Sequence, residues 1–136
     1  MLAQPPEVHT STVTASKVCA PSASSAAGTK PAILLAHYEY EPSTVADALR
    51  SWKDVVDYVV KNEYWTTGYT VGEEKDKSTV RTVETYEGWE FLEKVHAKSE
   101  VVLKSAERTG RNAVGKGAVR VVAVDGFLGR EGRARL

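Results

Sequence analysis

The feature that most constrains the fold is a change of hydrophobic period within residues 78–99, STVRTVETYEGWEFLEKVHAKS. Up to residue 85, β-branched and polar side chains alternate, which is typical of a half-buried β-strand. From Trp89 onward the spacing is helical, with Leu92, His96 and Ser99 following at i+3, i+7 and i+10. The stretch therefore predicts a strand that leads directly into an amphipathic helix, with a histidine on the helix face that meets the sheet.

Two segments ahead of this stretch predict a strand followed by a long helix. Residues 31–40, PAILLAHYEY, open as an apolar run and then alternate, so His37 is expected on one strand face and Tyr38 on the other. Thr44 is positioned as a hydroxyl cap for a helix that ends near residue 62. The apolar residues of this helix follow the helical template without a miss: Val45, Ala48, Leu49, Trp52, Val55, Val56 and Val59.

Two more strands complete the pattern. Residues 64–72, YWTTGYTVG, alternate, and Gly68 within them indicates a bulge or a close approach by backbone or ligand. A short charged turn joins this segment to the strand of residues 78–85, so the two strands are expected to be antiparallel neighbours. Residues 118–124, AVRVVAV, are almost continuously apolar, which favours a strand inside the sheet, and the preceding RNAVGKG is interpreted as a loop.

The order of these elements is strand, helix, strand, strand, helix, strand. It predicts an α+β fold of the ferredoxin-like β-α-β-β-α-β type, with a four-stranded antiparallel sheet and both helices on one face. The other sheet face would then present valines and aromatic residues, which a monomer rarely leaves open to water. We therefore expect a homodimer in which two sheets pack face to face, as in a dimeric α+β barrel.

The amino-acid composition limits which partners and which cellular compartment are expected. The 136 residues suit one domain, and 18 basic residues balance 18 acidic ones, so neither nucleic acid nor an anionic membrane is expected as a partner. A single cysteine and the lack of an apolar run of about 20 residues favour a cytoplasmic protein without disulfides or a membrane span. We expect a low-complexity N-terminal arm at 1–30, in which residues 7–14 could form an edge strand, an α+β domain at 31–127 and a basic C-terminal tail at 128–136.

Two short segments resemble the antibiotic biosynthesis monooxygenase domain family of the dimeric α+β barrel superfamily. NEYWTTGYTV at 62–71 is similar to the family's helix end and glycine-containing second strand. ETYEGWEFLEKVHAKS at 84–99 is similar to its third strand and following helix, with an H-x-x-S pattern at His96 to Ser99. The resemblance spans about residues 31–125. It implies cofactor-independent chemistry on aromatic or polyketide-like molecules, typically oxygenation of an anthrone-type phenol to a quinone.

The candidate site lies between the sheet and its helices. A cofactor-free oxygenase needs a base that deprotonates a phenol, and His37 and His96 are the candidate bases because histidine titrates near neutrality. Glu84 is expected to be a structural acceptor, or a partner of Arg81 or Arg120, rather than an acid catalyst. The candidate substrate-binding residues are Trp65, Tyr69, Glu84, Trp89 and Tyr38.

Three widely spaced histidines form no metal-binding pattern, so neither a metal nor a cofactor is expected. Two alternatives remain open for the function. The same side chains could catalyse enolisation, which suits a cofactor-free cyclase, decarboxylase or isomerase acting on a polyketide-like substrate. The other alternative is a non-catalytic binding module with the same dimeric fold.

Overall fold

The computed structural model describes residues 11–18, 31–75, 78–110 and 112–122. Within these residues the chain forms five strands, three α-helices and one short 3₁₀ helix. In chain order they are β1 (Ser11–Val18), β2 (Ala32–Tyr40), α1 (Val45–Asn62), β3 (Thr66–Glu74), β4 (Thr79–Tyr86), α2 (Trp89–Lys94), η1 (His96–Lys98), α3 (Glu100–Gly110) and β5 (Ala113–Val122).

The strands form one antiparallel sheet in the order β1-β3-β4-β2-β5. Strands β2 to β5, with α1 between the first two and α2 to α3 between the last two, have the ferredoxin-like arrangement, so the predicted α+β fold is confirmed. Strand β1 adds a fifth strand beside β3. It shares only residues 11–14 with the predicted edge strand, and residues 7–10 lie outside the described part of the chain, as does the predicted tail at 128–136.

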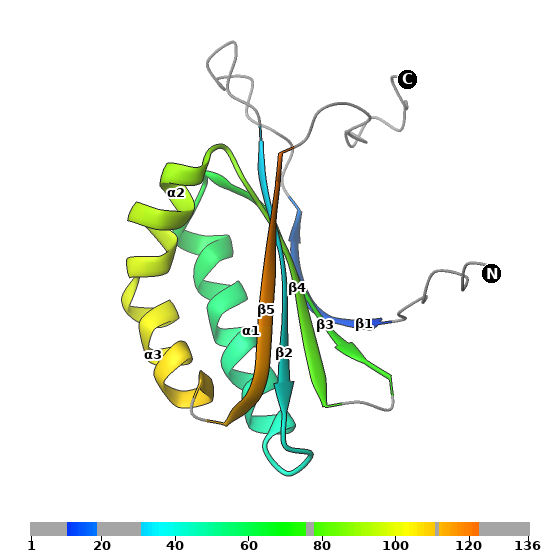
Figure 1. Cartoon of the computed structure of the whole chain (residues 1–136). Coiled ribbons are helices and arrows are strands. Elements are labelled where there is room, and N and C mark those ends of the chain that lie inside the picture. Colours follow the sequence, from blue (N-terminus) through cyan, green and yellow to red (C-terminus); the bar gives the residue numbers. More distant parts are fainter. Residues whose placement is uncertain (1–10, 19–30, 76–77, 111, 123–136) are drawn as a thin grey trace, which may run out of the picture.

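All helices lie on one side of the sheet, as expected (Figure 1). Strand β2 alternates accordingly: Ala36 and Tyr40 are buried toward the helices, while Leu35 is exposed on the opposite face. Helix α1 buries the predicted apolar stripe against the sheet because its apolar positions recur with the helical period. The main core cluster joins this stripe to β2, β3 and β4 and consists of Tyr40, Ala48, Trp52, Val55, Val56, Val59, Tyr69, Val71 and Val80.

The predicted irregularity at Gly68 is confirmed as a β-bulge. Thr66 pairs with Tyr86 and Gly68 pairs with Thr85, so Thr67 is an extra residue on β3. The bulge shifts the alternation of β3 by one position. As a result, both Thr66 and Tyr69 are buried.

The helix predicted to continue from Trp89 through His96 is interrupted. Ser99 has an extended backbone, with φ −65° and ψ 142°, and its hydroxyl accepts a hydrogen bond from the Val102 N–H at 3.4 Å. A serine in this conformation begins a new helix, so α2 and α3 are separate and His96 lies in the η1 turn between them. The predicted cap of α1 is also wrong, because the Thr44 hydroxyl donates to the Glu41 carbonyl at 3.0 Å instead.

Strand β5 departs from its prediction in length and position. It begins at Ala113 within the segment interpreted as a loop, and it lies at the sheet edge of the described chain rather than inside the sheet. The glycines that suggested a loop have a packing role. A Cβ on Gly117 would lie 2.5 Å from His37 Cε1, so glycine leaves room for the imidazole of the neighbouring strand to lie across β5 at this point.

Candidate functional site

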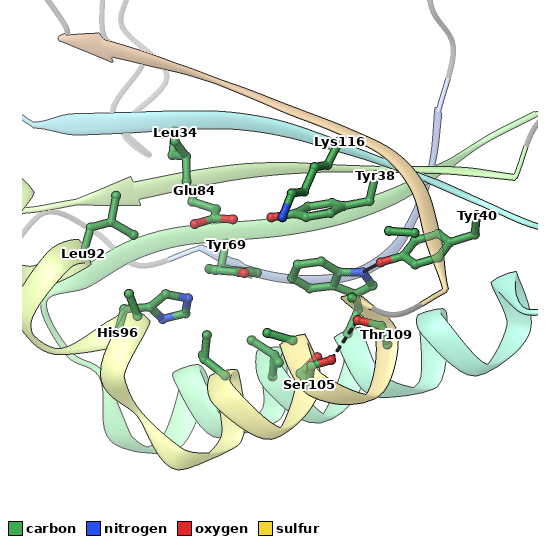
Figure 2. A pocket seen from close by; sticks show the side chains of 17 residues that line it. Leu34, Tyr38, Tyr40, Tyr69, Glu84, Leu92, His96, Ser105, Thr109 and Lys116 are labelled. Atoms are coloured by element: carbon green, nitrogen blue, oxygen red, sulfur yellow. Dashed lines mark hydrogen bonds between the residues drawn. The ribbon is translucent and has the colours of Figure 1, made fainter.

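A cavity of about 340 Å³ lies between the helix-facing side of the sheet and the helices (Figure 2). Strands β2, β3, β4 and β5 supply one wall, and helices α1 and α3 with the η1 turn supply the other. Most of its lining is apolar or aromatic, and a few polar side chains converge on it, which is typical of a small-molecule site. The polar and aromatic side chains that line it include Tyr38, Tyr40, Trp52, Tyr69, Glu84, His96, Ser105, Thr109 and Lys116.

One end of the cavity is defined by a buried pair, His96 and Glu63. His96 Nδ1 lies 2.9 and 3.1 Å from the two carboxylate oxygens of Glu63, and Thr66 donates its hydroxyl hydrogen to the same carboxylate at 2.7 Å. His96 and Glu63 are only 3% and 1% exposed. Because a carboxylate accepts but does not donate hydrogen bonds, Nδ1 carries the proton. That arrangement leaves Nε2 as the ring nitrogen with a lone pair, and Figure 2 shows the imidazole pointing into the cavity.

The chain positions this pair through the ends of two elements. Glu63 is the C-cap residue of α1, and its N–H donates to the Val59 carbonyl at 3.0 Å, so its side chain leaves the helix at a fixed place. His96 is held by the η1 turn, where the Ser99 N–H donates to the His96 carbonyl at 3.0 Å. The C-cap of α1 therefore positions the Glu63 carboxylate, and the η1 turn positions the imidazole that contacts it.

Two tyrosines surround the imidazole. The ring centroids of Tyr69 and Tyr86 lie 5.3 and 5.5 Å from that of His96. Burial raises the pKa of both phenols, and the neighbouring charge of Glu84 raises it further. Both side chains therefore keep their protons at neutral pH and act as hydrogen-bond donors.

Glu84 is the second buried carboxylate of the site. It accepts hydrogen bonds from the Thr82 hydroxyl and from the Tyr86 hydroxyl, each at 2.7 Å. The expectation that Glu84 is a structural acceptor agrees with these contacts. Its expected partnership with Arg81 or Arg120 does not form, because Arg81 contacts Glu74 and Arg120 contacts Glu93.

The other end of the cavity is aromatic. Tyr38 and Trp52 pack with ring centroids 5.0 Å apart, and the Trp52 indole N–H donates to the Tyr40 hydroxyl at 3.3 Å. Burial, followed by the charge of Glu84, raises the pKa of Tyr38 to about 12, so its hydroxyl stays protonated. Lys116 reaches this end from β5, where it pairs with Tyr38 of β2 (Figure 2).

The structure brings together four of the predicted site residues at this cavity: His96, Tyr69, Glu84 and Tyr38. The remaining three lie elsewhere. Trp65 stacks on Phe91 at a centroid distance of 5.8 Å, and Trp89 lies under the Arg120 guanidinium at 5.3 Å. His37 is on the opposite face of the sheet, paired with Arg81 and Gly117, so the prediction that it shares a pocket with His96 is wrong.

Sequence reasoning missed Glu63 and Lys116. Glu63 has a recognisable local signal, since it is an acidic residue directly after the apolar period of a helix ends. Nothing in the sequence around His96, 33 positions later, indicates that His96 contacts Glu63. Lys116 was hidden in the G-K-G stretch interpreted as a loop. Recognising a strand there would have placed Lys116 on one face and both glycines on the other.

The described residues include no group of three or more histidine, cysteine, aspartate or glutamate side chains arranged to hold a metal ion. None of the helices in this part of the chain combines the length and the hydropathy that a membrane crossing requires.

The ferredoxin-like sheet and the polar and aromatic cavity under it define an α+β domain with one described pocket on the helix side of the sheet. No protein-family model and no curated protein matches the chain. Solved structures do match. A "putative monooxygenase" from Lactobacillus acidophilus NCFM is similar at a TM-score of 0.68 and 15% identity, over 82% of this chain and 51% of that chain. The chain therefore spans about half the length of that protein.

Two other solved structures are covered over more of their own length. A "putative antibiotic biosynthesis monooxygenase" from Caulobacter crescentus CB15 has a TM-score of 0.66 and 18% identity, with 71% of this chain and 92% of that chain covered. A protein with the same name from Nitrosomonas europaea has a TM-score of 0.64 and 7% identity, with 69% and 90% covered. The fold of this chain is thus the fold of antibiotic biosynthesis monooxygenase structures, and the resemblance predicted from the two short segments is confirmed at the level of the fold.

Proposed function

We propose that the chain is a cofactor-free oxygenase that acts on an aromatic, polyketide-type phenol bound in this cavity. The observation that carries the proposal is the buried Glu63–His96 pair, in which the carboxylate orients the imidazole and leaves Nε2 directed at the ligand space. A base of this kind, held beside a largely apolar and aromatic cavity, is what a phenol needs in order to react with dioxygen.

The proposed reaction balances in atoms and in electrons. His96 Nε2 takes a proton from the substrate, and Glu63 stabilises the imidazolium that forms. The resulting anion is electron-rich enough to pass an electron to dioxygen, and recombination forms a carbon–oxygen bond. For an anthrone, the ring CH₂ becomes C=O, one oxygen atom of O₂ enters the quinone and the other leaves as water. Dioxygen is the only oxidant in this sequence.

The surrounding groups support these steps in different ways. Tyr38 remains protonated and can donate a hydrogen bond to a phenolate or carbonyl oxygen, whereas the Tyr69 hydroxyl interacts with Glu84. Trp52 and Tyr38 offer aromatic faces on which a flat ring can pack. Glu84 already accepts two hydrogen bonds and serves mainly to hold Tyr86 beside the imidazole.

A cofactor-free cyclase, decarboxylase or isomerase is the second candidate. The same base and the same phenol donor can form and stabilise an enolate without dioxygen, because proton removal is common to both reactions. A non-catalytic binding module is the third candidate.

The proposed assembly is a homodimer, and the apolar residues on the open sheet face support this proposal. Leu35 pairs across the sheet with Val83 on one side and Val119 on the other, and these side chains are 41%, 47% and 60% exposed. Val121, on the same face, is 38% exposed. A second copy of this chain could cover the patch, since a two-fold axis brings identical apolar residues together.

Turnover of an anthrone-type phenol in air and under nitrogen tests the proposed function. An oxygenase consumes one O₂ per quinone formed and stops under nitrogen. Product formation that continues at the same rate without oxygen identifies the enolising alternative. Binding without turnover under both atmospheres identifies the binding module.

A further inference from the structure

The rim of the cavity carries one cationic side chain, Lys116. Of the described residues that line the cavity, it is the only lysine or arginine. Its ammonium makes no ion pair or hydrogen bond with any described residue. By contrast, Arg108 is paired with Asp47 and Arg120 with Glu93. A charge left unpaired beside an aromatic cavity is available for a ligand.

The strand around Lys116 directs its side chain toward the cavity. Lys116 pairs with Tyr38, which faces the helices, so period 2 places Gly115 and Gly117 on the opposite face. With the side chains as they lie, a Cβ would be 2.7 Å from the Glu39 carboxylate at Gly115 and 2.5 Å from the His37 ring at Gly117, so a larger residue would require these side chains to move. The G-K-G segment therefore lets β5 lie close to β2 and keeps the lysine on the cavity side.

The two ends of the cavity differ in chemical character. The end near His96 holds the buried Glu63–His96 pair, which can take a proton from a neutral phenol, while Glu84 is not confined to this end because its charge also acts on Tyr38. The end near Tyr38 holds a cation, a phenol that donates a hydrogen bond and the indole of Trp52. A ligand with a neutral, ionisable phenol at one end and an anion at the other matches this polarity.

We propose that Lys116 binds a carboxylate on the aromatic substrate and so determines which phenols enter the cavity and in which orientation. This inference rests on the proposed function for the identity of the aromatic ring. The carboxylate contacts the Lys116 ammonium at the rim, the ring packs along Tyr38 and Trp52, and the phenol end reaches His96. A lysine at the rim can remain hydrated until the ligand arrives, because its side chain is exposed.

Binding of two matched compounds tests the inference without requiring turnover. The probes are 1,8-dihydroxyanthraquinone and its 3-carboxylic acid, which differ only in the anionic group, and isothermal titration calorimetry measures both dissociation constants at low ionic strength. The wild-type chain is expected to bind the acid about tenfold more tightly, as a charge-assisted contact predicts. The preference should shrink as sodium chloride is added, because the contact is at the rim.

Three variants at Lys116 and one control variant at Lys75 separate the role of Lys116 from general charge effects. Lys116→Ala and Lys116→Gln should bind both compounds equally, with the affinity for the uncharged compound retained, and Lys116→Arg should keep most of the preference. Lys75→Ala removes the same charge from the exposed end of the β3–β4 hairpin and should leave the preference unchanged. Thermal unfolding followed by circular dichroism checks that each variant is folded.

Three results overturn the inference: equal binding of the two compounds by the wild-type chain, an unchanged preference in Lys116→Ala, or no binding of either compound up to its solubility limit. The outcome is separable from that of the proposed function. A carboxylate preference that depends on Lys116, in a chain that consumes no oxygen, supports the inference and contradicts the oxygenase. Oxygen consumption that is indifferent to Lys116 and to the carboxylate does the reverse.

Discussion

Glu63 and His96 are separated by 33 positions in the sequence, yet the carboxylate and the imidazole Nδ1 lie 2.9 Å apart inside the protein. The contact joins the C-terminal end of α1 to the turn between α2 and α3. An isolated buried carboxylate is costly unless it is paired and hydrogen-bonded. Here Glu63 meets both conditions, with His96 on one side and the Thr66 hydroxyl on the other. The pair therefore fixes which imidazole nitrogen faces the cavity.

Glu63→Gln tests whether the carboxylate positions the base. An amide cannot stabilise the imidazolium as a carboxylate does, and its NH₂ group can donate to Nδ1 and so move the proton to Nε2. We expect kcat to fall by about 100-fold with KM nearly unchanged. Steady-state oxygen uptake gives both constants. Glu41→Gln, at an exposed glutamate in the β2–α1 turn, is the matched control and should keep the wild-type kcat. An unaltered kcat in Glu63→Gln would exclude the positioning role.

Val83→Asp tests the dimer. A charge on the open sheet face is buried twice in a two-fold interface, so the dimer dissociation constant should rise at least about 100-fold. Sedimentation velocity measures the change. Val60→Asp is a matched control, since Val60 is 51% exposed on α1 and Val83 is 47% exposed on β4. The proposed interface is contradicted by a monomeric wild-type chain, or by equal effects of the two substitutions.

The raised pKa of Tyr38 predicts how the free energy of unfolding changes at alkaline pH. Its folded pKa is about 12, against the ordinary value of 10.0, so the folded state retains a proton that the unfolded state loses. The resulting stabilisation is complete below pH 10 and is lost as the pH rises from about 10 toward 12. The free energy of unfolding should fall with pH in this window, by at most about 1.4 kcal/mol per pH unit from this residue.

Urea unfolding at a series of pH values measures that slope. Tyr38→Phe should make it shallower, because the phenol that titrates only in the unfolded chain is gone. Tyr64→Phe, at a side chain that is 77% exposed, should leave the slope unchanged. Equal slopes in the wild-type chain and Tyr38→Phe would contradict the raised pKa.

Local periodicity was enough to predict the ferredoxin-like order, the placement of His37 and Tyr38 on opposite strand faces and an irregularity at Gly68, because each depends on neighbouring residues. It did not predict which of the two strand faces meets the helices. It also carried a signal that was overlooked. Ser99 directly ahead of Glu100 is a helix start, and it separates α3 from the helix that begins at Trp89. Because α2 ends at Lys94, His96 lies in the η1 turn rather than on a continuous helical stripe.

Long-range contacts could not be predicted in this way. The Glu63–His96 pair depends on how α1 and η1 meet, and nothing near either residue encodes the other. The glycines around Lys116 could not be explained from the sequence either, because they leave room for His37 and Glu39 on a neighbouring strand. Such glycines resemble loop residues in the sequence and become intelligible only when the sheet register is known.

The most direct test of the central claim compares the kcat of His96→Ala with that of His37→Ala, using an anthrone-type phenol in an oxygen electrode. His96 faces the cavity and His37 faces away from it, so the two substitutions remove the same group from opposite sides of one sheet. We predict that His96→Ala lowers kcat by at least about 100-fold and that His37→Ala stays within about threefold of the wild type when assayed as a dimer. Wild-type turnover by His96→Ala would contradict the account.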